Sequence, residues 1–137
     1  DIRNSVNIPV LSVIEETASF LKKQNINRVG LLSTVITQRR KLYEKSLAAA
    51  RIEFVLPNDF QQAKIGKIIH NLVINRQGNK EREDLVDIVN DFEKLGVKHV
   101  IMACTDLQLL IPNHDKLKIY DTMKILAEAT VSRILEK

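Results

Sequence analysis

The sequence predicts a small α/β protein with a doubly wound, mostly parallel sheet of about four strands flanked by helices. Three observations predict this class. Short apolar runs rich in Val, Ile and Leu alternate along the chain with longer amphipathic stretches. These runs are continuous, as in strands that helices bury on both faces. At 137 residues, the chain has the length of one domain with a sizeable core.

In the first half of the chain, strands and helices alternate regularly. The run 8–13 is predicted as a strand because it is β-branched and carries Pro9 near its start, where proline is tolerated. The helix that follows has its glutamates first and its lysines last, which suits the helix dipole. The predicted elements are a strand at 8–13, a helix at 14–23, a strand at 28–32, a helix at 37–50 and a strand at 52–56.

The second half continues the alternation. Apolar residues in 59–74 and in 80–95 recur at helical spacing, which gives each segment one buried face. Gly96 follows the second of these helices, at the position where glycine commonly ends a helix. The remaining predicted elements are a loop at 75–79, a strand at 98–103, a short apolar element at 107–111, a strand at 117–120 and a helix from Asp121 to Leu135.

Composition excludes several classes of protein. Hydrophobic residues make up 45% and charged residues 28%, which is ordinary for a soluble globular chain. The net charge of +4 comes from scattered basic residues and aromatic residues are only 4%, so we expect no nucleic-acid partner. No apolar run approaches membrane-spanning length and no signal-peptide pattern is present, so we expect no membrane partner. A single cysteine fits a reducing compartment, so we expect a cytoplasmic location.

The only cysteine is the first candidate for chemistry. Cys104 directly follows the apolar run 98–103 and precedes Thr105 and Asp106. In parallel sheets, chemistry collects at the carboxyl ends of the strands. A thiol there, beside a hydroxyl and a carboxylate, is placed to act as a reactive thiolate. An alternative stays open, because free cysteine is among the most buried residue types and usually packs as a small hydrophobe.

Hydroxyl side chains follow the predicted strand 28–32. Ser33 and Thr34 lie at its end, and Thr37 lies where the next helix begins. A helix N-terminus offers free N–H groups and partial positive charge, so this loop is a candidate site for a carboxylate or a phosphate. Thr37 has the alternative role of a helix cap. The chain has no G-x-G-x-x-G and no P-loop, so a dinucleotide site is not predicted.

The histidines predict no metal site. With a single cysteine in the chain, a structural zinc centre would need histidines at ligand spacing, and these are far apart. They are His70, His99 and His114.

Several stretches together resemble the second half of the cofactor-independent aspartate/glutamate racemase family, and most of all its aspartate racemases. The stretch 103–107 is similar to the motif of the second catalytic cysteine, usually Gly-Cys-Thr-Glu-Ile. The stretch 30–34, followed by Thr37 and Tyr43, resembles the loop that holds the substrate carboxylate. Further similarity lies at the crossing between lobes and at the closing strand and helix, in 8–18, 120–122 and 127–129.

The resemblance implies a two-lobed enzyme with a cysteine from each lobe in the cleft between them. One thiolate removes the α-proton of the amino acid and the other thiol protonates the opposite face. Cys104 would be one of this pair, and the substrate would be a small acidic amino acid, with no cofactor. The implied substrate contacts are Ser33, Thr34, Thr37, Lys80, Thr105 and Asp106.

The resemblance also implies a division of the chain. Residues 1–13 would cross from a first lobe, 14–116 would form the C-terminal lobe, and 117–137 would return toward the first lobe. The chain begins with Asp1 rather than methionine, which favours a fragment or a processed chain. We expect a homodimer.

Departures from the family pattern leave other functions open. The chain has no second cysteine, Asp106 stands where glutamate is usual, and Ala103 stands where glycine is usual. We therefore expect this chain alone to be inactive. One alternative is a non-catalytic module that binds a carboxylate or dimerises. Another is a hydantoin, glutamate or maleate-type isomerase, although the glutamate racemase pattern has a histidine where Asp106 stands.

Overall fold

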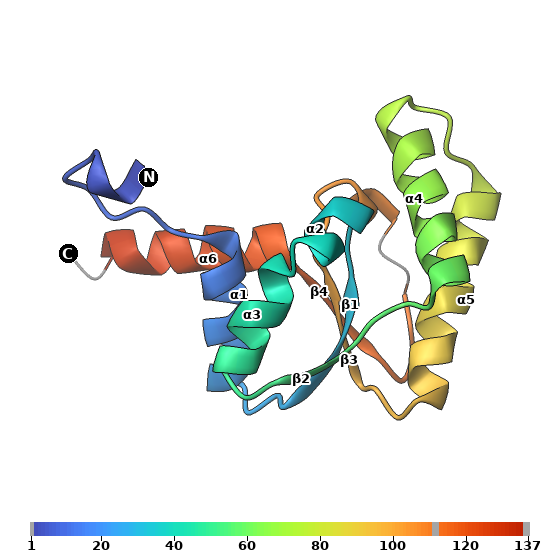
Figure 1. Cartoon of the computed structure of the whole chain (residues 1–137), viewed down its shortest axis with the longest axis horizontal. Helices are drawn as coiled ribbons and strands as arrows, with labels where there is room; N and C mark the ends of the chain where they lie inside the picture. Colours follow the sequence, from blue (N-terminus) through green and yellow to red (C-terminus); the bar gives the residue numbers. More distant parts are fainter. Residues whose placement is uncertain (1, 111–112, 136–137) are drawn as a thin grey trace.

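Four strands form one parallel sheet at the centre of the computed structural model, which describes residues 2–110 and 113–135 (Figure 1). The order across the sheet is β2-β1-β3-β4, and each neighbouring pair is parallel. The central pair is β1 and β3, which helices cover on both faces, so the side chains of these strands are almost all buried. The strands are β1 (Arg28–Leu32), β2 (Glu53–Val55), β3 (His99–Met102) and β4 (Lys118–Asp121). The predicted fold class is thus confirmed.

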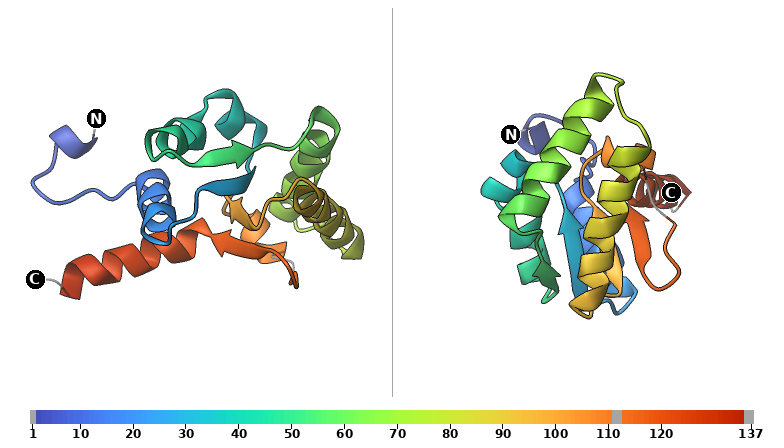
Figure 2. Two further views of the ribbon diagram at one scale, coloured as in Figure 1. Left: turned by 90° about the horizontal axis from the view of Figure 1, so that it is seen from below. Right: turned by 90° about the vertical axis from the view of Figure 1, so that its right-hand side faces the viewer.

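Helices cover both faces of the sheet (Figure 2). One core joins the sheet to α1 (Val13–Lys23), α3 (Leu42–Ala49) and α6 (Thr122–Leu135). The other core joins it to α4 (Asp59–Val73), α5 (Asn79–Lys94) and the 3-10 helix η2 (Leu107–Leu110). Two short elements complete the order, namely the 3-10 helix η1 (Ile2–Asn4) and α2 (Val35–Arg39).

The strand predicted at 8–13 is wrong. Residues 8–12 have no regular structure, and Ser12 caps α1, where it accepts a hydrogen bond from the backbone of Glu15. The segment lies outside the sheet, beyond the α1 end of the molecule (Figure 1). A strand needs a neighbour for its N–H and C=O groups, and none of the four strands is adjacent to this segment.

The single helix predicted at 37–50 is also wrong, because it is divided into α2 and α3. Lys41 separates them with a φ of 50°, which is a left-handed conformation that ends one helix before the next begins. The first of the two helices starts earlier than predicted. Thr34 is its N-cap, and Thr37 lies within its first turn.

The other predicted elements are present, with ends shifted by at most one residue. Gly96 has the positive φ of 74° that a helix C-terminus favours. The apolar element predicted at 107–111 is η2 as far as Leu110, and Ile111 lies outside the described residues.

Candidate functional site

The candidate site lies at the carboxyl end of the sheet, where three neighbouring strands end level with one another. Leu32 pairs with Met102, and Met102 pairs with Asp121. The ladder continues one step further, because the backbone N–H of Ala103 donates to the carbonyl of Leu32 at 2.8 Å. The segments that follow β1, β3 and β4 therefore begin side by side. This register brings the Ser33–Thr34 loop next to the segment that carries Cys104.

Cys104 is a buried thiol, 7% exposed, with a carboxylate as its partner. Its thiol donates to Oδ2 of Asp106, with 3.8 Å between Sγ and the oxygen. Burial raises the pKa of the Cys104 thiol, the backbone N–H groups of Asp106 and Leu107 oppose that rise, and the charge of Asp106 adds to it. The site therefore favours the protonated thiol over the thiolate.

The loop after β1 is held by its own hydroxyls. Oγ1 of Thr34 accepts from the backbone N–H of Thr37 at 3.1 Å and lies 2.9 Å from Oγ1 of Thr37. Ser33 is buried, and its hydroxyl donates to the carbonyl of Thr34 at 3.3 Å. The two threonines are only half-buried, so their hydroxyls are the more accessible polar groups of this loop.

Two other predicted site residues are exposed. Thr105 follows Cys104 and faces solvent, while Asp106 next to it is half-buried. Lys80 lies in the first turn of α5, where its charge acts on Asp84 of the same helix. The described contacts bring Cys104 together with Asp106, and Thr34 with Thr37, but none of them joins Lys80 to either pair.

Gln62 of α4 is a contributor that sequence reasoning missed. Its Nε2 donates to the carbonyl of Ser33 at 3.0 Å, and this bond is buried. Gln62 thereby ties α4 to the end of β1. Within the described chain, its Oε1 is buried without a hydrogen-bond partner. The sequence does hold a signal for this role. Gln62 lies three residues before Ile65, so helical spacing places its polar side chain on the apolar face of α4.

Tyr43 and Thr122 were not predicted as substrate contacts, although both belong to the stretches that carry the family resemblance, and the structure places them near Cys104. Thr122 is 2% exposed, and its hydroxyl donates to the carbonyl of Met102 at 3.0 Å. Burial raises the pKa of Tyr43, a hydrogen bond with Thr122 opposes that rise, and the nearby Cys104 adds to it. Sequence patterns place these two residues only on the first turns of their helices. Tertiary contact alone reveals that they meet.

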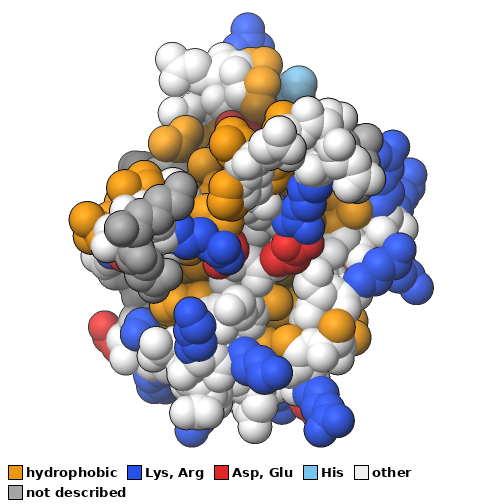
Figure 3. Space-filling model, turned by 90° about the vertical axis from the view of Figure 1, so that its left-hand side faces the viewer, with side chains coloured by type: hydrophobic (Ala, Val, Ile, Leu, Met, Phe, Trp, Pro, Cys, Tyr) orange, Lys and Arg blue, Asp and Glu red, His pale blue; other side chains and the backbone are white. Residues whose placement is uncertain are grey.

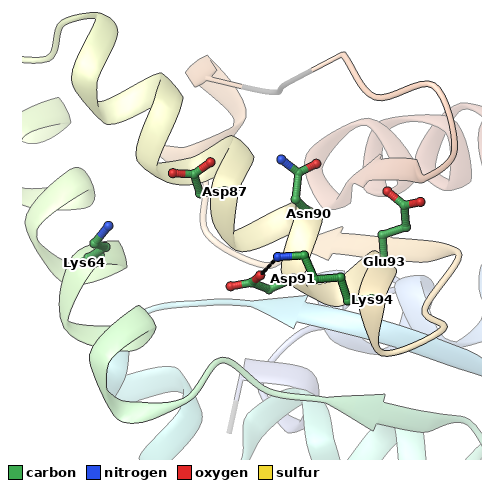
Figure 4. Close-up of a pocket in the computed structure, with 6 residues that line it drawn as sticks. All are labelled: Lys64, Asp87, Asn90, Asp91, Glu93 and Lys94. Atoms are coloured by element: carbon green, nitrogen blue, oxygen red, sulfur yellow. Dashed lines mark hydrogen bonds and ion pairs between the residues drawn. The ribbon is translucent and has the colours of Figure 1, made fainter.

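A separate polar groove of about 640 Å³ lies between α4 and α5 (Figure 4). Its charges are largely paired already, since Lys94 donates to Asp91 and Lys64 donates to Asp84, each at 2.7 Å. The groove contains none of the predicted site residues. Its lining residues are Lys64, Asp87, Asn90, Asp91, Glu93 and Lys94.

Neither a metal centre nor a membrane segment is found in the described part of the chain. Residues 2–110 and 113–135 contain no cluster of three His, Cys, Asp or Glu side chains that could hold a metal ion. Within the same ranges, no helix has the length and apolar character needed to cross a bilayer.

Comparison with known families and proteins agrees with the fold. The family model for Asp/Glu/hydantoin racemases matches residues 1–130. Among curated sequences, an uncharacterised protein of the pnlA 3′ region of Pectobacterium carotovorum is 26% identical over 113 residues. That match covers 81% of this chain and 73% of the other protein.

Solved structures of similar fold are longer than this chain. A Yersinia pestis protein assigned as an Asp/Glu racemase is 28% identical with a TM-score of 0.88, and the match covers 98% of this chain and 60% of that one. An aspartate racemase homologue from Pyrococcus horikoshii is 29% identical with a TM-score of 0.84, and the match covers 96% of this chain and 59% of that one. Picrophilus torridus aspartate racemase is 29% identical with a TM-score of 0.77, and the match covers 90% of this chain and 52% of that one. The chain thus spans a little over half the length of these relatives.

Proposed function

Because the chain belongs to the Asp/Glu/hydantoin racemase family, we propose that it is the C-terminal part of a longer racemase that interconverts L- and D-aspartate or glutamate. The proposed reaction uses two thiols and no pyridoxal phosphate. The observation that carries the proposal is the place of Cys104, a thiol at the carboxyl end of β3 beside the hydroxyl loop that follows β1. A cytoplasmic location suits a reaction that depends on a free thiol.

The proposed chemistry is a proton exchange between two sulfur atoms and one carbon. The thiolate of a cysteine in another lobe takes the α-proton, and the electron pair of the broken C–H bond stays on the α-carbon. Cys104 then gives its proton to the opposite face, which forms the new C–H bond and leaves Cys104 as a thiolate. The hydrogen bond to Asp106 and the burial of the thiol keep a proton on Cys104, as a donor requires.

The developing carbanion needs electrostatic help from groups around the substrate. In this proposal, the threonine hydroxyls of the loop and its backbone N–H groups bind the α-carboxylate, and a lysine meets the acidic side chain. Asp106 has a second role as the partner of the thiol. The proposed substrate contacts are Ser33, Thr34, Thr37, Lys80, Thr105 and Asp106.

A second lobe would be needed to complete the site. We propose that residues 1–13 cross from that lobe, that 14–116 form the C-terminal lobe and that 117–137 return toward the first. Both chain ends lie on one side of the molecule, where ion pairs tie Arg3 to Glu15 and Arg133 to Glu16. Apolar side chains are exposed on this side among basic ones (Figure 3). Those at the two ends of the chain are Ile2, Val6, Ile8, Val131, Ile134 and Leu135.

Deuterium exchange at the α-carbon tests the proposed reaction directly. The longer parent protein, incubated in heavy water with either enantiomer of aspartate or glutamate, is expected to introduce deuterium at Cα. Cys104→Ala in that protein removes one of the two proton carriers, so we expect the exchange coupled to racemisation to fall by at least about 10²-fold. The 137-residue chain, which has one thiol, is expected to show no turnover. Absence of exchange with both amino acids, or unchanged turnover after Cys104→Ala, would contradict the proposal.

A second candidate function is a non-catalytic module that binds a small carboxylate or forms a homodimer. The single cysteine and the exposed apolar side chains at the chain ends favour it. In sedimentation, a homodimer would dissociate on dilution, and Val131→Ser together with Ile134→Ser would weaken it. A chain that stays monomeric at high concentration would contradict the homodimer.

A further inference from the structure

Thr122 connects the last helix to the strand that carries the cysteine. It is the first residue of α6, directly after β4, and its side chain is almost fully buried. Its Oγ1 donates to the carbonyl of Met102 at 3.0 Å in a buried hydrogen bond. Met102 is the last residue of β3 and lies two positions before Cys104. The hydroxyl thus holds the backbone immediately ahead of the thiol.

The hydroxyl of Thr122 uses its donor in this one bond. A threonine hydroxyl has one proton, and that of Thr122 is committed to the Met102 carbonyl. Tyr43 of α3 lies close to Thr122, is 4% exposed and packs in the core that contains Ile101 and Ile125. The hydrogen bond of Thr122 accordingly joins α6 to β3 in a tightly packed part of the core.

The backbone before Cys104 is fixed from two directions. On the β1 side, the Ala103 N–H donates to the carbonyl of Leu32 at 2.8 Å. On the β4 side, Thr122 binds the Met102 carbonyl. We propose that Thr122 is a positioning residue that holds the Cys104 thiol in its buried place against Asp106. The inference rests on the proposed role of Cys104, but its test needs no turnover.

Alkylation of the single thiol by iodoacetamide, followed across pH, measures this role in the 137-residue chain. Thr122→Val keeps the shape of the side chain and removes its hydroxyl. Without that anchor, we expect Sγ to leave its buried site part of the time. The thiol ionises more readily once it is exposed to solvent. We expect alkylation at neutral pH to become at least about threefold faster, and its pH profile to move to lower pH. Thr122→Ser keeps the hydroxyl and is expected to restore the original profile.

Two further variants make the test specific. Thr17→Val is a matched control, because Thr17 is equally buried and donates to the carbonyl of Val13 at 2.6 Å, within α1. It removes the same kind of bond and is expected to leave alkylation unchanged. Thr122→Ala also removes the hydroxyl that binds the Met102 carbonyl, so it is expected to shift the profile in the same direction as Thr122→Val. It serves in place of Thr122→Val if circular dichroism shows that variant to be unfolded.

The outcomes separate this inference from the proposed function. Folded Thr122→Val and Thr122→Ala chains with the original alkylation profile would overturn the positioning role. An equal shift in Thr17→Val would also overturn it, because the cause would be a general loss of stability. A shift confined to Thr122→Val and Thr122→Ala supports the role of Thr122, even where the longer protein shows no deuterium exchange and the racemase proposal fails.

Discussion

Cys104 owes its protonation mainly to burial, with a smaller contribution from the carboxylate of Asp106. Burial is the largest cause of its raised pKa, and the backbone N–H groups at the start of η2 act against it. From the sequence, the apolar run ending at Cys104 predicts a strand and a thiol at the strand's carboxyl end. The protonation state was beyond sequence reasoning, because it depends on which side chains pack over the sulfur.

The raised pKa of Cys104 leads to a prediction about how the stability of the chain depends on pH. The folded chain holds the Cys104 proton more tightly than the unfolded chain, since burial raises the pKa of the thiol. The contribution of the protonated thiol to the free energy of unfolding is therefore fully present below the pKa of an unfolded cysteine. It is lost as the pH rises through the pKa of the folded state. We expect the free energy of unfolding of the chain, relative to that of Cys104→Ala, to decrease above about pH 8.5.

Urea denaturation at a series of pH values measures this difference. The Cys104→Ala chain is the control for the buried tyrosines Tyr43 and Tyr120, whose pKa values burial also raises, because it retains both of them. A difference between the two chains that stays constant between pH 7 and pH 10 would contradict the prediction.

At the scale of elements, most helices and strands follow from hydrophobic periodicity, and the exceptions have physical causes. The segment 8–13 has the composition of a strand, yet the four strands of the sheet leave it without a pairing neighbour. The helix predicted at 37–50 has helix-forming residues throughout, yet it is divided at Lys41. A division of this kind lets α3 turn its apolar face onto the sheet, which is a tertiary requirement that local propensity does not contain.

The left-handed conformation of Lys41 predicts how a substitution there changes the stability of the chain. Its φ of 50° is unfavourable for any residue with a Cβ, and glycine adopts it without that penalty. We expect Lys41→Gly to raise the free energy of unfolding by about 0.5–1 kcal/mol. Lys45→Gly is the matched control, because Lys45 is an exposed lysine inside α3, and it is expected to lower stability by about 1 kcal/mol. If both substitutions lowered the free energy of unfolding equally, the left-handed conformation of Lys41 would not be a source of strain.

At the scale of the whole molecule, the sheet and α5 approach each other closely at one point. A Cβ added at Gly30 of β1 would lie 2.7 Å from Cδ2 of Phe92, which is one of the largest fully enclosed side chains of the core. Glycine at this position therefore sets the distance between the sheet and the helix layer. The same layer contacts η2 and the Cys104 segment within one core, so this distance also bears on the site.

Gly30→Ala is expected to force these two layers apart. The clash with Phe92 should lower the free energy of unfolding by about 1–3 kcal/mol, as overpacking of a core does. Gly66→Ala provides the matched control in α4, because a Cβ there meets nothing within 4 Å. It is expected to raise stability by about 0.5–1 kcal/mol through better helix propensity. Urea denaturation of both variants measures the contrast, and a stabilised Gly30→Ala chain would disprove the close approach.

The sequence alone determined the alternation of strands and helices, the parallel sheet and the placement of Cys104 after a buried strand. These follow from short-range patterns, because periodicity and turn residues act between neighbours in the chain. Only the tertiary structure decided that Gln62 binds the Ser33 carbonyl, that Thr122 binds the Met102 carbonyl and that Tyr43 packs close to both Thr122 and Cys104. Each of these contacts joins elements that are distant in the sequence. Such contacts arise from the order and register of the strands, which no local pattern encodes.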